Sequence, residues 1–275
     1  MLRSMHELEN YAIGATDGDV GHVKDFYFDD DTWVIRYLVV ATGSWLMNRD
    51  VLISPISVHN PDWAGRTLPV SITKEQVRNS PDIDTEKPVS RQHEMRYLGY
   101  YGYPYYWGGR GMWGAGMYPY AMYPGYDYGA SSVERAREEE IYARTENERH
   151  RNDDPRLRSC KAVVGYHIHA TDGHIGHVEG MLVDEETWAV RYLVVNTSNW
   201  WMGHKVLIAP QWVTAVDWSG QSVSVDLSRG LIQDGPVYDP DAGTSRQQEL
   251  SLYQHFGRTG YWADDARRET EISRV

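Results

Sequence analysis

The stretch that decides the fold is ATDGDVGHVKDFYFDDDTWVIRYLVVA, residues 15–41. A close copy, ATDGHIGHVEGMLVDEETWAVRYLVVN, occupies residues 170–196. The two stretches are 155 residues apart, and the same offset aligns Tyr106-Trp107 with Tyr261-Trp262 without a gap. A sequence that keeps one register over roughly ninety residues contains a duplicated domain. The 275 residues therefore predict two similar domains joined by a long insert.

The composition argues against several classes of protein. The formal net charge is −12 and Lys and Arg do not cluster, so a nucleic-acid partner is not expected. Neither a signal peptide nor an apolar run of membrane-spanning length is encoded. The single cysteine, Cys160, cannot form an intrachain disulfide and fits a reducing compartment. We expect a cytoplasmic location, either free or peripheral on the cytoplasmic face of the inner membrane.

Each copy has the pattern of short β-strands. The pair Asp17-Gly18 favours a hairpin turn, and the apolar run Leu38-Val39-Val40 indicates a central strand covered on both faces. The strands expected in the first copy are Tyr11–Ala15, Val20–Phe28, Trp33–Ala41, Val51–Ser54, Val58–Asn60 and Thr67–Ile72. Turn residues recur between them at the spacing of a small antiparallel barrel. The predicted fold class is therefore mainly β, with two such barrels.

Short helices are predicted after each barrel, and the insert between the copies has two parts. Thr73 and Gln76 match a capping box, and Ser90–Tyr97 and its copy Ser245–Leu252 predict a second short helix. The insert begins with an irregular segment rich in Tyr, Gly, Trp and Pro and continues as a charged connecting helix. The predicted division is a first barrel with its helical tail (1–98), the aromatic segment (99–130), the charged helix (131–156), a second barrel with its helical tail (157–262) and a charged tail that frays (263–275).

The repeated residues resemble the PRC-barrel domain. The resemblance rests on the turn Asp17-Gly18, the step Gly21-His22-Val23, the acidic turn at Asp29 and the strand 35–40, and both copies show it. The family includes the cytoplasmic part of the H subunit of purple bacterial photosynthetic reaction centres and the C-terminal half of a ribosome maturation factor. The likeness to the H subunit extends into the helical tail, through residues 73–81, 91–94 and 100–106.

The resemblance implies a non-catalytic scaffold or adaptor without cofactors. An H subunit normally begins with a membrane helix and has one barrel, whereas this sequence shows two barrels and no such helix. We expect protein partners, in particular a membrane-bound photosynthetic complex that the protein would stabilise while shielding its quinone region. The alternative is a free-standing, stress-linked or ribosome-associated binding module that acts as a homo-oligomer. A third hypothesis is a metal protein.

Four histidines carry the metal hypothesis. His167 and His169 lie two residues apart on a predicted strand and share one face, and His174 and His177 follow across the turn. Among the equivalent positions of the first copy, only His22 is a histidine. A metal site present in one copy alone is disfavoured, so we expect the chain to hold no metal there.

The two arginines inside apolar strands and the aspartates of the hairpin turns are expected to serve the fold. An unpaired charge is costly inside a barrel, so Arg36 and Arg191 should each pair with an acidic residue of the same barrel. Asp17 and Asp172 precede glycine, and their carboxylates are expected to accept hydrogen bonds from nearby backbone N–H groups.

Large aromatic side chains are the candidates for contact with partners, because Trp, Tyr and Met are enriched in protein interfaces. They gather in the loop after each central strand and in the aromatic segment. The candidates are Trp45, Tyr101, Tyr105, Tyr106, Trp107, Trp113, Trp200, Trp201 and Met202.

Overall fold

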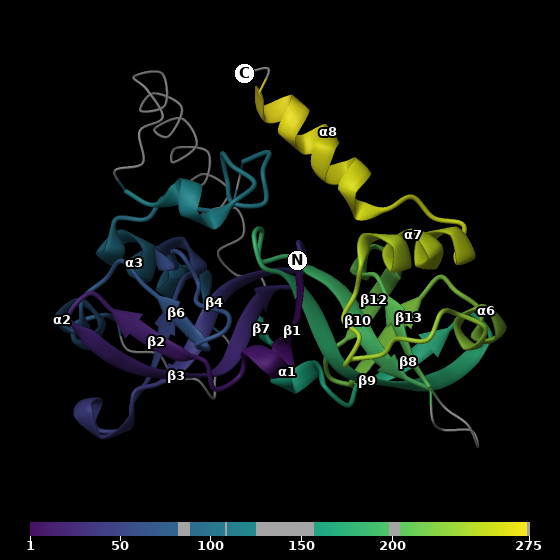
Figure 1. Ribbon diagram of the computed structural model, residues 1–275, viewed down its shortest axis with the longest axis horizontal. Coiled ribbons are helices and arrows are strands. Elements are labelled where there is room, and N and C mark those ends of the chain that lie inside the picture. Colours follow the sequence, from purple (N-terminus) through teal and green to yellow (C-terminus); the bar gives the residue numbers. More distant parts are fainter. Residues whose placement is uncertain (82–88, 108, 125–156, 198–203, 274–275) are drawn as a thin grey trace. The chain divides into compact units, whose positions relative to one another are not determined.

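The computed structural model describes residues 1–81, 89–107, 109–124, 157–197 and 204–273, which form a mainly β structure with two sheets (Figure 1). The chain divides into two compact units. The N-unit comprises Leu8–Ser159, Glu186–Ala189 and Ala266–Val275. The C-unit comprises Met1–Glu7, Cys160–Glu185 and Val190–Asp265. The predicted charged helix over 131–156 lies outside the described residues.

The sheet of the N-unit has the order β5-β4-β3-β2-β6, and β7 pairs with β3 beside this path. Its strands are β2 (Ala12–Ala15), β3 (Gly18–Asp29), β4 (Val34–Ala41), β5 (Asp50–Ile53), β6 (Thr67–Pro69) and β7 (Leu157–Ser159). Seven of the eight residues of β4 are buried, as expected of a strand covered on both faces. The prediction of a central strand is therefore confirmed.

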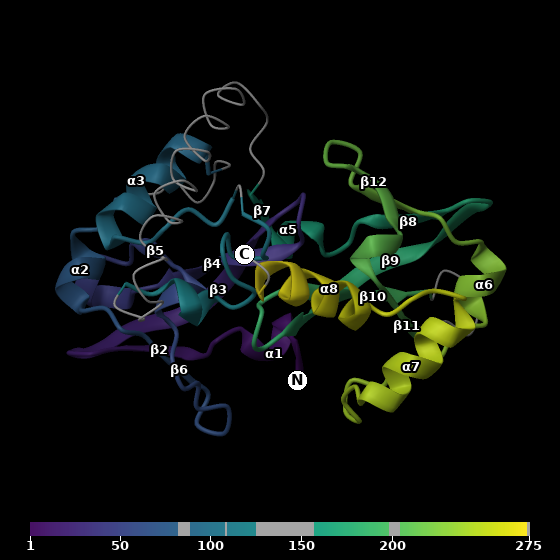
Figure 2. The same ribbon diagram turned by 90° about the horizontal axis from the view of Figure 1, so that it is seen from above.

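The sheet of the C-unit repeats this arrangement in the order β11-β10-β9-β8-β13-β12, and β1 pairs with β9 (Figure 2). Its strands are β1 (Leu2–Ser4), β8 (His167–Ala170), β9 (Gly173–Asp184), β10 (Val190–Asn196), β11 (Lys205–Ile208), β12 (Val213–Asp217) and β13 (Ser222–Val225). Both sheets contain one parallel pair, β2 with β6 and β8 with β13, which the sequence pattern did not predict.

The leading strand of each repeat lies in the sheet of the other repeat. β1 precedes the first copy yet pairs with β9, with Arg3 opposite Val183. β7 precedes the second copy yet pairs with β3, with Arg158 opposite Phe28. Ion pairs accompany both ladders: Arg3 Nε lies 2.9 Å from Glu185 Oε2, and Arg158 Nε lies 2.9 Å from Asp30 Oδ2. The structural units therefore differ from the sequence division for residues 1–7, which belong to the C-unit, and for 157–159, which belong to the N-unit.

The glycine of the Gly-His-Val step allows two strands to approach closely. A Cβ atom at Gly21 would lie 2.0 Å from the carbonyl oxygen of Ala41, and one at Gly176 would lie 2.1 Å from that of Asn196. No side chain fits at such distances. The step therefore requires glycine for contact between β3 and β4 and between β9 and β10.

The hydrogen-bonded sheets remain open among the described residues, so the predicted barrel closure is not seen. The strand predicted at Val58–Asn60 is reduced to one bridge, between Val58 and Val70, and the short helix η2 (Pro55–Ser57) precedes it. A side chain covers the edge of β5 instead. The hydroxyl of Tyr97 accepts from Ser54 N at 3.0 Å and donates to Leu52 O at 3.1 Å. Both backbone groups are thereby satisfied without another strand.

Short helices follow each sheet, as predicted. These are α2 (Lys74–Arg78), α3 (Arg91–Tyr101), α6 (Arg229–Gln233) and α7 (Arg246–His255). The capping box of Thr73 and Gln76 is present at α2. Asp17 Oδ1 accepts from Lys74 N, and Asp172 Oδ1 accepts from Arg229 N, both at 2.7 Å, so each hairpin turn is tied to the helix that follows its sheet.

The remaining helices are short, with one exception near the C-terminus. They are α1 (Met5–Leu8), α5 (Cys160–Val163), η1 (Gly43–Leu46), η3 (Pro119–Met122) and η4 (Pro210–Trp212). The prediction that 263–275 frays is wrong for most of its length, because α8 (Tyr261–Ser273) is helical there. The hydroxyls of Thr270 and Ser273 each bond a carbonyl one turn earlier. Among the described residues, no helix has the length and apolar character needed to cross a membrane.

Candidate functional site

A buried group of polar side chains joins β4, α3 and the aromatic segment in the N-unit. Glu94 of α3 is 2% exposed and accepts hydrogen bonds from the hydroxyls of Tyr37, at 3.2 Å, and Tyr106. Arg91 donates to the second oxygen of Glu94 at 3.0 Å and to the Tyr106 hydroxyl at 3.0 Å. The guanidinium carbon of Arg36 lies 3.9 Å from the centre of the Tyr106 ring. We call these five residues the N-cluster.

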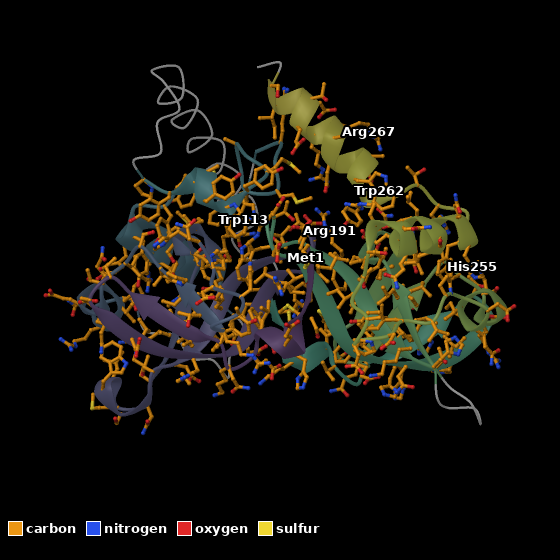
Figure 3. All side chains as sticks on the ribbon, in the orientation of Figure 1. Met1, Trp113, Arg191, His255, Trp262 and Arg267 are labelled. Atoms are coloured by element: carbon orange, nitrogen blue, oxygen red, sulfur yellow. The ribbon has the colours of Figure 1, made fainter. Side chains whose placement is uncertain are left out.

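Arg36 is 2% exposed and bonds mainly to neutral acceptors. It donates to Met112 O at 2.7 Å and to Thr32 Oγ1 at 3.1 Å, while Asp29 Oδ2 lies 4.0 Å away. The expected pairing with an acidic residue is therefore present but long. The ring of Trp113, which is labelled in Figure 3, is fully buried and lies 4.8 Å from the same guanidinium. Carbonyl and aromatic contacts thus compensate much of the charge.

Burial governs the protonation of the N-cluster. Removal from water raises the pKa of Glu94, although Arg91 and the hydrogen bond from Tyr106 oppose this rise by favouring the charged form. Burial and the nearby Glu94 also raise the pKa values of Tyr37 and Tyr106. The two phenols therefore remain protonated and donate to the carboxyl group at neutral pH.

The C-unit contains the same arrangement 155 residues later, which we call the C-cluster. Its members are Arg191, Tyr192, Arg246, Glu249 and Tyr261. Tyr192 donates to Glu249 at 2.9 Å, Arg246 lies 3.1 Å from the other oxygen of Glu249, and Arg191 lies over the Tyr261 ring at 4.0 Å. Burial is the first cause that raises the pKa values of Tyr192 and Tyr261.

The two clusters differ in what closes them. Arg191 forms a 2.6 Å ion pair with Asp265 and lies 3.3 Å from Asp184, whereas the equivalent Arg36 meets a carbonyl and Trp113. The Arg246 side chain is 54% exposed, and that of Arg91 only 23%. The N-cluster is therefore sealed by aromatic groups, while the C-cluster is closed by carboxylates and reaches solvent.

Most of the aromatic candidates pack on their own unit. Tyr106 and Trp113 are buried, and the Trp113 indole donates to Thr187 O at 2.8 Å. Tyr105 and Trp107 stack at 4.8 Å, and Tyr101 stacks on Tyr103 at 5.4 Å. Tyr106 and Trp113 thus present no ring at the surface. Partner contact through the half-buried Tyr101, Tyr105 and Trp107 stays a prediction.

The loop candidates divide between described and undescribed residues. Trp45 is half-buried and its indole donates to Val20 O at 2.6 Å, so the ring is anchored to β3. Trp200, Trp201 and Met202 lie outside the described residues. The role of this group in partner binding stays a prediction.

The four histidines lie near one another without forming a group suited to a metal ion. His167 is paired with His177 across the hairpin, and the rings of His169 and His174 are 3.9 Å apart. Burial and the two neighbouring histidines lower the pKa of His169. Within the described part of the chain, no three His, Cys, Asp or Glu residues are arranged to hold a metal.

The C-unit has a cavity of about 290 Å³ that the sequence did not indicate. It is lined by Leu207 of β11, Leu252 of α7 and the segment 236–239. Its acidic lining residues are Asp239 and Glu249, but both oxygens of Glu249 are already bonded within the C-cluster. None of its lining residues is a lysine or arginine. Val237, one of its lining residues, is 67% exposed. The one signal in the sequence is a valine in a predicted loop, and such residues are too common to identify a cavity.

Comparison with known proteins identifies the first repeat. Residues 3–77, from β1 to α2, match the model of the PRC-barrel domain. No curated protein matches the chain. The family model thus covers the leading strand, the hairpins and the first helix after the sheet, which are the parts that the structure shows twice. The chain carries a PRC-barrel domain, a protein-interaction module, over residues 3–77.

Proposed function

We propose that the protein is a non-catalytic adaptor that binds protein partners and resembles the cytoplasmic domain of the reaction-centre H subunit. The match of residues 3–77 to the PRC-barrel domain carries this proposal. The two clusters support it, because their carboxyl, phenol and guanidinium groups are bonded to one another and hold strands, helices and the aromatic segment together.

The partner in this proposal is a membrane-bound photosynthetic complex. The protein would bind its cytoplasmic face, stabilise it and shield the quinone region, as the resemblance of the helical tail to the H subunit implies. The cavity of the C-unit is the proposed contact point. The carboxyl group of Asp239 and the apolar walls suit a lysine or arginine side chain of the partner, whose apolar stem and cationic end match both features.

Affinity capture from detergent-solubilised membranes tests this function. The tagged full chain should recover reaction-centre subunits, identified by mass spectrometry. Ser251→Trp, which places a large ring at the cavity, should reduce recovery at least tenfold, the cost of losing about 1.4 kcal/mol of binding. Arg96→Trp at the equivalent position of α3 is the matched control and should leave recovery unchanged.

One result would contradict the proposed partner, and another would contradict the proposed contact point. Recovery of ribosomal proteins or of the chain's own copies alone would favour the free-standing homo-oligomeric module. Equal loss of partner in both tryptophan variants would remove the cavity as the contact point while leaving adaptor function in place.

A further inference from the structure

The outer edges of β5 and β11 are equivalent in the two repeats but end differently. In the N-unit, the Tyr97 hydroxyl of α3 donates to Leu52 O at 3.1 Å and accepts from Ser54 N at 3.0 Å. The residues 155 positions later are Leu252, Leu207 and Ala209. A leucine side chain has no polar atom, so α7 cannot supply this pair of hydrogen bonds. The N-unit therefore shows which chemical group the C-unit lacks at the same place.

The backbone of β11 directs Leu207 and Ala209 away from the sheet. β11 is the last strand in its sheet, and Tyr238 N donates to Lys205 O at 2.8 Å from outside it. Alternate residues of a strand direct their backbone groups to the same side. Leu207 O and Ala209 N therefore face outward, as Leu52 O and Ser54 N do in the N-unit.

The segment beside β11 does not satisfy these two groups. Val206 forms an antiparallel bridge with Val237, and the same register places Pro236 opposite Leu207. Proline has no N–H to donate. Leu207 is 5% exposed and Ala209 1% exposed, and within the described ranges we find no donor to Leu207 O at this edge and no acceptor for Ala209 N. Buried backbone groups without a partner are costly, so a ligand that bonds to both would be stabilised.

The cavity of the C-unit lies at this edge, because Leu207 and Leu252 both line it. Its other walls combine Pro236 and Val237 with polar residues of α7 such as Ser251. A volume of about 290 Å³ is at the small end of the range for ligand pockets and suits a single ring.

We propose that this cavity binds a small phenol, whose hydroxyl donates to Leu207 O and accepts from Ala209 N as that of Tyr97 does at the equivalent edge. A hydroxyl can serve both groups, whereas an ammonium group can only donate. The ring lies between the apolar walls. Because the phenol would fill the space assigned to the partner's lysine or arginine, it would release the partner. This regulation rests on the proposed function, but the binding of the phenol does not.

Titration of the full chain with p-cresol tests the binding, and toluene is the matched ligand without a hydroxyl. We expect p-cresol to bind weakly, with a Kd of about 1 mM, because one ring offers few atoms for contact. Toluene should bind about tenfold more weakly, since it leaves both backbone groups unpaired. Amide NMR signals of residues 207–209 should shift with p-cresol, and those of residues 52–54 should not.

Two substitutions of Leu252 test the position of the hydroxyl. Leu252→Tyr supplies the group from α7 and should abolish p-cresol binding. Leu252→Phe supplies the ring alone and is the matched control for size. The melting temperature of the tyrosine variant should exceed that of the phenylalanine variant by about 3 °C, the effect of hydrogen bonds gained at the edge.

The reciprocal change in the N-unit tests the same chemistry by rescue. Tyr97→Leu leaves Leu52 O and Ser54 N without their hydroxyl, so p-cresol should raise the melting temperature of this variant more than that of the unmodified protein. Tyr97→Phe keeps the ring and should show no such extra gain. The Leu252 variants test the proposal independently if Tyr97→Leu does not fold.

Asp239 separates the phenol from the partner's cation. Its carboxylate lines the cavity and accepts from Asp241 N at 3.0 Å. Asp239→Asn should leave p-cresol binding within about twofold of the unmodified protein, since a neutral ligand needs no counter-charge, and should reduce capture of the partner. Saturating p-cresol should reduce capture by the unmodified protein at least fivefold.

Several outcomes would overturn the proposal. Equal affinity for p-cresol and toluene, or undiminished binding of p-cresol to Leu252→Tyr, would remove the phenol site. Tighter binding of N-acetyltyrosinamide than of p-cresol would assign the site to a tyrosine of a partner chain instead of a small molecule. Unchanged capture in saturating p-cresol would remove the regulation. Failure of capture under all conditions would contradict the proposed function alone, because titration with p-cresol requires no partner.

Discussion

The N-cluster and the C-cluster have the same five residue types at equivalent positions but different surroundings. In the N-unit the arginine of the central strand meets Met112 O and Trp113, and in the C-unit it meets Asp265 and Asp184. An arginine paired with carboxylates remains stable when water reaches it, whereas a buried guanidinium among aromatic rings depends on those rings remaining in place. The comparison shows that one inherited polar network has been sealed in one unit and left near solvent in the other.

The largest effect should follow removal of the ring that seals the N-cluster. Trp113→Ala deletes a fully buried indole and its bond to Thr187 O, and should lower the free energy of unfolding by about 4 kcal/mol. Trp262→Ala, at a half-buried ring over Arg246, is the control and should cost much less. Chemical denaturation measures both. Equal losses would mean that the two clusters are closed to the same degree.

The next comparison removes the shared carboxyl group. Glu94→Ala leaves Arg91 without its bonded counter-charge and leaves Arg36 with only the long pair to Asp29, so it should cost about 3 kcal/mol. Glu249→Ala should cost less, because the exposed Arg246 side chain can bind water instead. Hydrogen exchange resolved by unit measures each loss locally. A larger loss of stability from Glu249→Ala than from Glu94→Ala would contradict the conclusion that the N-cluster is the more tightly closed of the two.

The exchanged strands provide a third test. Proline at position 3 removes an N–H from the β1 ladder, and proline at position 158 does the same in β7. Arg3→Pro should lower the free energy of opening of β9, measured by amide hydrogen exchange, by about 2 kcal/mol, and Arg158→Pro should have the same effect on β3. Arg3→Ala and Arg158→Ala are the controls, because they remove the ion pairs but keep the backbone N–H groups. If Arg3→Pro instead lowered protection in the N-unit, and Arg158→Pro in the C-unit, the pairing of each leading strand with the sheet of the other repeat would be contradicted.

The smallest effect concerns pH. Because burial raises the pKa of Glu94 above its ordinary 4.5, the folded protein binds this proton more tightly than the unfolded chain does. This contribution to stability is complete below pH 4.5 and is lost as pH rises through the raised pKa. The stability of the unmodified protein relative to Glu94→Gln should therefore fall over that interval, by about 1.4 kcal/mol per unit of pKa difference. If this relative stability rose with pH instead, folding would favour the charged form of Glu94, which would contradict the raised pKa.

Sequence reasoning worked best where the physical cause is local. The turn at Asp17, the capping box at Thr73 and the apolar pattern of β4 depend on neighbouring residues, and each was predicted. It failed for α8, where a charged composition suggested fraying. For the arginines it predicted acidic partners, which Arg191 has in Asp184 and Arg36 has, at 4.0 Å, in Asp29. It did not predict the bond from Arg36 to Met112 O, because that acceptor comes from a segment without periodicity.

The sequence alone determined that a small β-unit occurs twice, because turn chemistry, glycine contacts and strand periodicity are encoded within each copy. Only the tertiary structure decided which leading strand completes which sheet. Leu-Arg-Ser occurs before both copies, at 2–4 and 157–159, so local sequence offers the same strand to either sheet. The tertiary structure likewise decided which cluster is sealed, since that depends on whether Trp113 or Asp265 packs against an arginine that both units share.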